Sequence, residues 1–452
     1  MEENQSMALK PQTMTQGPIG RQIIIFSLPL LGSSLIQQLY NTVDLIFVGR
    51  FLNPSAAAAV GAGSLLVFCA LGIFIGLSVG TGVVTARYLG AGDYERVNKT
   101  IHTAMAMSIY GGAVFTLLGI GLAPLLLKLL NTPQEIMAQA TLYIRIYFCG
   151  FMAMSSYNMG AGILRALGDS KSPMIYQLIG GLGNVGANFL FIPILGWGVG
   201  GSAVATLCSQ TVAALLVFLH LVRGNRYYRL RLKGLSIARE YGGRILAVGI
   251  PAGIQGVVVT LSNLLVQSHI NTLSINSIAA FTAYFRVELF IYLPILAISQ
   301  TAGIFAGHNI GAGKLNRVRK GTRVCLAIGV ITAVSLSGSV LLMGEHLFAL
   351  FTNSKAVVAI GLELAKVTFP FYFIYVFLEI FASVVRGAGK AIPPMIIILV
   401  TLCGLRLILV NVFMHLWPSA TSVAVVYPLT WLTAALALGG YYFLGKWGKQ
   451  EG

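Results

Sequence analysis

Charged residues are scarce in this chain of 452 residues: only 10% are Asp, Glu, Lys or Arg, whereas 56% belong to the apolar set. In a typical soluble protein, about a quarter of all residues are charged. This shortage excludes a secreted enzyme, a soluble DNA-binding protein and a disordered tail. Since a helix of about 20 apolar residues crosses a bilayer, we predict an all-α polytopic membrane protein.

Motifs for metal binding and for common enzyme chemistry are also missing. The five cysteines are scattered through or beside apolar runs and form neither a metal spacing nor a disulfide framework. No GxxxxGK[ST], HExxH or nucleophile elbow occurs, which argues against ATP-driven transport and hydrolysis. We therefore expect neither an enzyme nor a cofactor. The polar first twenty residues do not read as a cleavable signal peptide.

Twelve hydrophobic runs, bounded by charged or Gly/Pro clusters, predict twelve transmembrane helices. Their approximate spans are 22–48, 57–82, 101–127, 135–158, 172–195, 199–222, 245–270, 278–306, 324–350, 356–384, 392–416 and 421–445.

Basic residues account for the net charge of +17 and orient the predicted helices. With the N-terminus inside, 23 of the 30 Lys and Arg fall in inner segments and 3 in outer loops (Arg50, Lys128 and Lys355). The other four lie in apolar runs: Arg145, Arg286, Lys366 and Arg406. Cytoplasmic loops collect Lys and Arg, so the bias places both termini in the cytoplasm. The positive charge then reports topology, and we expect no nucleic-acid partner.

The longest polar stretch divides the chain into two halves. Its basic residues alternate with Tyr227 and Tyr228, a pattern also seen in RNA binding, but a linker at the surface of an anionic bilayer explains them better. We predict two lobes: helices 1–6 at residues 21–222 and helices 7–12 at residues 244–445. A linker at residues 223–243 joins them, and tails at residues 1–20 and 446–452 flank them.

The two halves repeat one another at an offset of about 221 residues. A GAG turn at Gly90–Gly92 returns at Gly311–Gly313. At the same offset Arg165, Gly168 and Pro173 match Arg386, Gly389 and Pro394. Each half has an even number of helices, so both enter the membrane from one side and are related by a pseudo-two-fold axis along its normal. Such lobes favour a transporter, although a channel can also contain repeats.

Asp44 is the strongest candidate for a functional ionisable group, because charged residues at membrane depth are costly. Asn41 lies three residues earlier and shares its helix face, and Asn184 and Asn188 share a face of helix five. A carboxylate among amide oxygens could bind Na⁺, or it could hold a proton. The alternative is a hydrogen-bonded structural Asp.

The second half offers weaker candidates. Glu288 and Glu379 lie deep in helices eight and ten and, with Arg286, form a possible second-lobe site; a structural partnership with Arg286 or Arg406 is the alternative. Aromatic and methionine side chains could line a cleft for apolar cations. The candidates are Tyr40, Met154, Tyr157 and Tyr284.

The chain resembles the multidrug and toxic compound extrusion (MATE) transporters of bacterial type. The resemblance rests on the two repeated lobes, the Pro29…Asp44 helix, the repeated GAG and R-x-x-G…P-M loops, and Asn184-x₃-Asn188 followed by GWGVGGSAVAT. It implies antiport in which an inward H⁺ or Na⁺ gradient drives export of organic cations, drugs or amphipathic metabolites. It also implies a bacterial cytoplasmic membrane location, and we expect a monomer.

The resemblance also assigns residues. Some relatives have a cation site in the first lobe, and Asp44 matches the essential Asp of their helix one. Asn184 matches the amide residue of their helix five, and Thr206 matches a threonine of their helix six. Tyr143 resembles a tyrosine of helix four near that site. Many relatives carry a second Asp where this chain has Asn188. Another branch uses a helix-seven Glu, which is absent here.

Three rival functions remain open at the level of sequence. A flippase of lipid-linked sugars from the same superfamily would need several cavity Arg or Lys, and only the four intramembrane bases could serve. A membrane lipid transferase would need clustered acids or histidines, and the inner loops offer only Asp93, Glu95, Asp169 and Glu240. A passive channel could not move its substrate against a gradient.

Overall fold

The computed structural model describes residues 13–224 and 227–448. The predicted inner-face residues Lys10, Arg226 and Lys449 lie outside the described residues, as does most of the predicted N-terminal tail.

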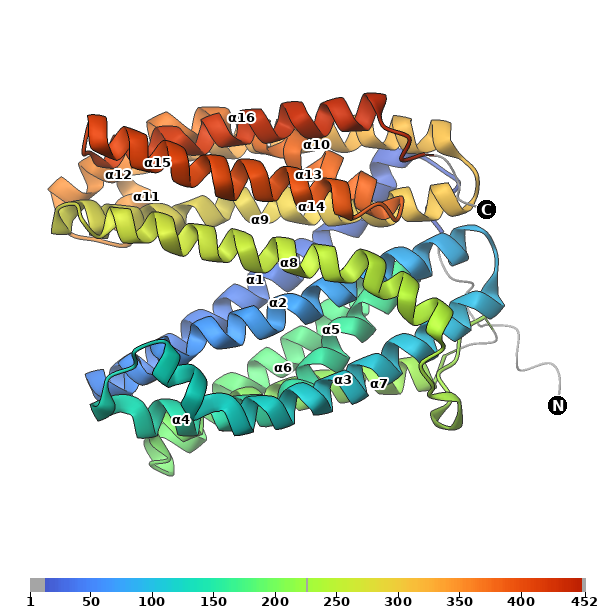
Figure 1. The fold of residues 1–452 in the computed structure, drawn as a ribbon, viewed down its shortest axis with the longest axis horizontal. Helices are drawn as coiled ribbons and strands as arrows, with labels where there is room; N and C mark the ends of the chain where they lie inside the picture. The colour runs from blue at the N-terminus through green and yellow to red at the C-terminus, as the bar shows by residue number, and fades with distance from the viewer. Residues whose placement is uncertain (1–12, 225–226, 449–452) are drawn as a thin grey trace. The chain divides into compact units, whose positions relative to one another are not determined.

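Helices make up nearly all of the described chain (Figure 1), and no strand occurs within it. They are α1 (Ile19–Phe51), α2 (Pro54–Gly90), α3 (Tyr94–Leu129), α4 (Gln134–Cys149), α5 (Phe151–Ala166), α6 (Lys171–Phe189), α7 (Gly198–Val222), α8 (Arg239–Ile270), α9 (Ile275–Gly311), α10 (Leu315–Leu342), α11 (Gly344–Ala349), α12 (Lys355–Thr368), α13 (Tyr372–Gly387), α14 (Ile392–Ile398), α15 (Arg406–Leu416) and α16 (Ala420–Leu444). Short π-helical turns, η2 (Leu190–Ile194) and η5 (Leu399–Leu405), continue α6 and join α14 to α15.

The number of spans confirms the sequence prediction. Within the described residues, 11 helical segments are long and apolar enough to cross a membrane, and α4 with α5 forms a twelfth span bent by 45°. Several spans turn large apolar side chains outward, including Leu117, Leu182, Ile331 and Leu436, each at least 66% exposed. Faces of this kind require lipid rather than water, so the all-α polytopic class is confirmed.

Some helices start earlier than hydropathy indicated. Helix α3 begins at Tyr94 instead of residue 101, because Asp93 caps it by accepting a hydrogen bond from the Arg96 backbone N–H at 3.0 Å. Helix α10 likewise begins at Leu315 instead of residue 324. These first turns are polar, so a search for apolar runs cannot find them.

The helices form two compact units. Among the described residues, unit 1 holds residues 13, 32–224 and 227–253, and unit 2 holds residues 14–31 and 254–448. In unit 1, α2 packs on α3, α4 and α5, and α6 packs on α7; in unit 2, α9 packs on α10, α12 and α13, and α13 packs on α16. Helix α1 therefore begins in unit 2 and continues into unit 1 at Gly32.

The internal repeat is visible in the backbone. Gly92 and Gly313 adopt φ of 74° and 70°, and Gly168 and Gly389 adopt 93° and 85°. Each glycine ends a helix in the left-handed conformation that side chains disfavour. The same closing bonds follow, from Asp93 N to Tyr88 O at 3.0 Å and from Lys314 N to Asn309 O at 2.7 Å. Sequence-matched glycines thus terminate matched helices in both halves.

Candidate functional site

Unit 1 gathers polar side chains from α1, α6 and α7 around Asp44. Asn188 on α6 donates its Nδ2–H to Asp44 Oδ1 at 2.5 Å. Thr206 on α7 donates its hydroxyl to Asp44 Oδ2 at 3.3 Å. Each carboxylate oxygen therefore has a donor from a different helix.

A second amide extends this group. Asn188 also donates to Asn184 Oδ1 at 2.9 Å, one turn away on α6, and both asparagines are fully buried. The carbonyl oxygen Asn188 Oδ1 is buried without a hydrogen-bond partner among the described residues. An unpartnered buried oxygen is costly, and here it lies on a side chain that contacts the carboxylate.

Three tyrosines lie near the Asp44 carboxylate. Tyr40 is buried on α1, and its hydroxyl lies 2.8 Å from Ser209 Oγ on α7. The charge of Asp44 acts electrostatically on the hydroxyl groups of Tyr40, Tyr143 and Tyr147. The Tyr143 and Tyr147 rings lie 5.9 Å apart on α4. The structure thus brings together Asp44, Asn184, Asn188, Thr206, Tyr143 and Tyr40.

Asn41 is not part of this cluster. Its side chain is exposed, and its hydrogen bonds join Gln37 at 3.3 Å and Gln38 at 3.5 Å, both on α1. Spacing of three residues allowed it to share a face with Asp44, but the neighbouring glutamines hold its amide instead.

Two members of the cluster escaped the sequence argument. Tyr147 lies four residues after Tyr143, and Ser209 lies three after Thr206, so helical spacing from the named residues would have found both. Neither stands out by itself, because Tyr and Ser are common in transmembrane helices.

The cluster has the chemistry of a small-cation site. Two carboxylate oxygens and an unpartnered amide oxygen are hard ligands suited to Na⁺, and the same carboxylate can take a proton. Either occupant neutralises a charge that is costly at membrane depth.

Removing the Asn188 amide should weaken this site. In the variant Asn188→Leu, the cluster loses the unpartnered oxygen Asn188 Oδ1, which is one of its possible Na⁺ ligands, and Asn184 Oδ1 loses its partner. If the lost ligand contributes as much as a hydrogen bond to a charged group, about 1.5–3 kcal/mol, we expect the Na⁺ concentration at half-saturation of the site to rise about tenfold or more. Val185→Leu, on the exposed side of α6, is the control and should leave that concentration unchanged.

Unit 2 also holds two carboxylates in its helices, Glu379 buried and Glu288 half-buried, and their partners differ from those of Asp44. Tyr372 on α13 donates its hydroxyl to Glu288 Oε1 on α9 at 2.5 Å. Glu379 accepts from Tyr375 at 3.0 Å and from Ser299 at 3.1 Å. Both acids are therefore held by hydroxyl groups within the α9–α13 interface.

The repeat explains the position of Glu379. Ser299 also donates to the Glu379 backbone carbonyl at 3.1 Å, and in unit 1 Ser78 donates to the Asn158 carbonyl at 2.6 Å. These pairs match at the repeat offset, so unit 2 has a carboxylate where unit 1 has an amide.

The two arginines that the sequence places inside the apolar runs of unit 2, Arg286 and Arg406, differ in exposure. Arg286 is exposed, and no ion pair joins it to Glu288 among the described residues. Arg406 is buried, donates to Asn263 Oδ1 at 3.2 Å, and lies 4.6 Å from the centre of the Tyr427 ring. Glu288 is close enough to Arg406 for the positive charge of that guanidinium to stabilise its carboxylate.

Three side chains predicted for a substrate cleft lie in packed interiors. Met154, Tyr157 and Tyr284 are 1–4% exposed. Tyr157 donates to the Pro173 carbonyl at 3.0 Å, and Tyr284 donates to Thr368 Oγ1 at 2.9 Å. Both tyrosine hydroxyl groups thus form hydrogen bonds within their own units.

Comparisons with known proteins agree with this architecture. The MatE family model matches residues 29–190 and again residues 251–412, one match in each half. The probable multidrug resistance protein YpnP of Bacillus subtilis (strain 168) is 28% identical over 444 residues, which cover 97% of this chain and 98% of that protein. The multidrug export protein MepA of Staphylococcus aureus (strain NCTC 8325 / PS 47) is 27% identical over 78% of each chain.

Among solved structures, the outward-facing conformation of a multidrug resistance MATE family transporter of the MOP superfamily matches with a TM-score of 0.91. It is 23% identical in sequence, and the match covers 97% of this chain and 98% of that one.

Proposed function

Because the chain belongs to the MatE family of multidrug transporters, we propose that it is an H⁺- or Na⁺-coupled antiporter that exports organic cations, drugs or amphipathic metabolites by alternating access. We place it in the bacterial cytoplasmic membrane with both termini in the cytoplasm, in accord with the inner-face excess of Lys and Arg.

The Asp44 cluster is the observation that carries the proposal. A single carboxylate with one donor on each oxygen, and an adjacent unpartnered amide oxygen, can bind and release one small cation. The other two acids of the described chain that lie deep in apolar helices, Glu288 and Glu379, are in unit 2 and have tyrosine donors. Asp44 is therefore our coupling residue.

Coupling requires that the cation and the exported substrate disfavour each other's binding, and this effect is reciprocal by thermodynamic linkage. Helix α1 offers a route for it, because Asp44 lies in unit 1 whereas residues 19–31 of the same helix belong to unit 2. A cation that changes the hydrogen bonds of Asp44 changes the packing of a helix that both units share.

Driven export from liposomes tests the proposal. The purified protein is reconstituted with a fluorescent lipophilic cation, and a Na⁺ gradient or a pH gradient is imposed separately. We expect transport of the dye against its own gradient with at least one of the two. Dye movement that only follows its own gradient, with either ion, would identify a channel instead.

The second-lobe site of Glu288, Glu379 and Arg286 remains a prediction that isosteric variants can test. Glutamine can still accept the hydrogen bonds of Tyr372 and Tyr375, so Glu288→Gln and Glu379→Gln remove charge with little change in packing. If Asp44 is the only coupling group, both variants keep driven export within about twofold of the wild-type rate. Loss of driven export in a stable, folded variant would place a second coupling group in unit 2.

A flippase remains the alternative, and the buried Arg406 is the feature that favours it. Its guanidinium is already engaged by Asn263, Thr430 and the Tyr427 ring, which leaves it less available for a pyrophosphate. Tight binding of an undecaprenyl phospholipid, without binding of organic cations, would decide for the flippase.

A further inference from the structure

The turn between α9 and α10 holds the segment that precedes α1. Lys314 Nζ donates to the Thr15 carbonyl at 3.0 Å, and Arg317 donates to the Gly17 carbonyl at 2.8 Å and to Gln22 Oε1 at 3.1 Å. All of these residues belong to unit 2. The two cations thus contact neutral oxygens, which do not compensate their charge.

In the matched turn of unit 1, acidic side chains neutralise the basic ones. There the sequence GAGDYERVNK provides two acids and two bases, and Asp93 pairs with Arg96 at 3.2 Å while Glu95 pairs with Lys99 at 2.7 Å. In unit 2 the sequence is GAGKLNRVRK, with four bases and no acid. Lys314 stands in the place of Asp93, and Asn316 in the place of Glu95.

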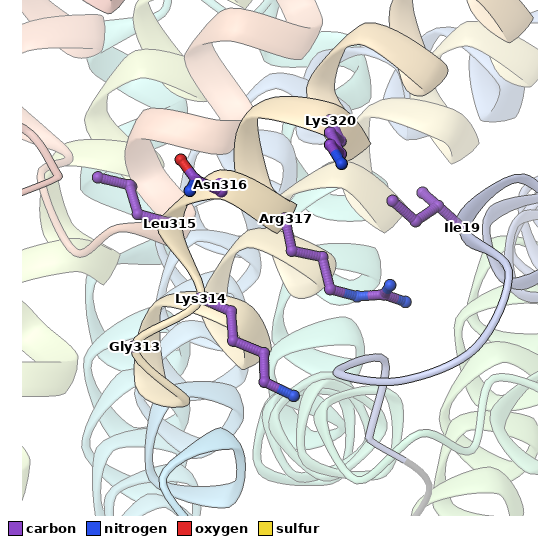
Figure 2. Close-up of a pocket in the computed structure, with 7 residues that line it drawn as sticks. All are labelled: Ile19, Gly313, Lys314, Leu315, Asn316, Arg317 and Lys320. Atoms are coloured by element: carbon purple, nitrogen blue, oxygen red, sulfur yellow. The ribbon is translucent and has the colours of Figure 1, made fainter.

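No carboxylate of the described chain lies within ion-pair distance of Lys314, Arg317 or Lys320. These three side chains line a surface hollow together with Ile19, Gly313, Leu315 and Asn316. Figure 2 shows Lys314 and Arg317 extending on the same side of the turn, toward the segment before α1. The hollow therefore combines three positive charges with an apolar edge.

We propose that this hollow binds a phosphate group, carried by the headgroup of an anionic phospholipid in the inner leaflet. A phosphate would supply the negative charge that Asp93 and Glu95 supply in unit 1 and that this turn lacks. Phosphate oxygens accept hydrogen bonds from both ammonium and guanidinium groups. The basic turn belongs to the predicted cytoplasmic side, where anionic lipids attract Lys and Arg. Ile19 and Leu315 offer apolar contact for the glycerol and the first acyl carbons.

The test measures lipid binding to the purified full-length protein in an uncharged detergent. Dioctanoyl phosphatidylglycerol, dioctanoyl phosphatidylcholine and inorganic phosphate are titrated separately. The double variant K314D/N316E gives the turn the acids of its unit 1 counterpart. With a contribution of about 1 kcal/mol for each basic residue, we expect it to bind phosphatidylglycerol at least about tenfold more weakly than wild type does.

A charge-matched control exists at the start of α12, on the predicted outer side. The variant N353E/K355D makes the same two kinds of substitution at two exposed residues with the same spacing, and it should bind phosphatidylglycerol like wild type. Lys320→Gln removes one cation without touching the contacts to Thr15 and Gly17, and it should weaken binding about fivefold.

The three probes separate the possible outcomes. Tight binding of phosphatidylglycerol with weak binding of inorganic phosphate supports a lipid site. Equally tight binding of inorganic phosphate that is lost in K314D/N316E supports the same site with a soluble phosphate as ligand. Binding of phosphatidylcholine as tight as that of phosphatidylglycerol, or unchanged binding in K314D/N316E and Lys320→Gln, would overturn the proposal.

Discussion

The variant Asp44→Asn is expected to reduce gradient-driven export to the leak rate of protein-free liposomes. The asparagine Oδ1 can still accept a hydrogen bond from Asn188 or Thr206, so the cluster keeps its shape. It cannot take a proton or neutralise a cation, so the imposed gradient no longer acts on α1. The initial rate of dye transport is the measurement.

A second carboxylate provides the control for this variant. Asp93 caps α3 and pairs with Arg96 at the predicted inner surface, and asparagine is an equally good helix cap. Asp93→Asn should therefore keep wild-type export. If Asp44→Asn, folded and correctly inserted, transports as fast as Asp93→Asn, Asp44 is not the coupling residue.

The variant Gly387→Val should strongly destabilise unit 2. A Cβ atom at Gly387 on α13 would lie 2.3 Å from the Gly303 carbonyl oxygen on α9 and 3.0 Å from the Ala306 Cβ. Backbone atoms cannot move aside like a flexible side chain, so the two helices must separate. We expect the apparent melting temperature in detergent to fall by about 5 °C or more.

The same substitution at Gly440 on α16 is the matched control. A Cβ there would meet no atom within 4 Å, so Gly440→Val adds a branched side chain to a membrane helix without a clash. Its melting temperature should stay within about 2 °C of the wild-type value. Equal effects of the two variants would show that helix propensity, rather than the close approach of α9 and α13, controls stability here.

The fold was largely predictable because the membrane imposes a simple physical rule. Apolar runs such as residues 392–416 match their helices closely, since a segment in lipid must satisfy its own backbone hydrogen bonds. The rule does not apply outside the membrane, where the Asp93 cap lets α3 begin seven residues before the predicted span. It also gives no sign of the 45° bend between α4 and α5, where Gly150 separates the two helices.

The candidate site was predictable only in part. A lone carboxylate in an apolar helix marks Asp44, and the spacing of Asn184 and Asn188 places both on one face of α6. Spacing failed for Asn41, because Gln37 and Gln38 compete for its amide. It also could not distinguish Tyr40, which lies at the site, from Tyr157 and Tyr284, which pack inside their units.

The dissociation constant of a lipophilic cation, measured with and without the coupling ion, tests the central claim most directly. Tetraphenylphosphonium is titrated into wild type and Asp44→Asn at low and high Na⁺, and again at low and high pH. Linkage predicts that one of these ions weakens wild-type binding about fivefold or more and leaves Asp44→Asn binding unchanged. Wild-type binding that is unaffected by both ions, or strengthened by them, would contradict an antiporter that competes through Asp44.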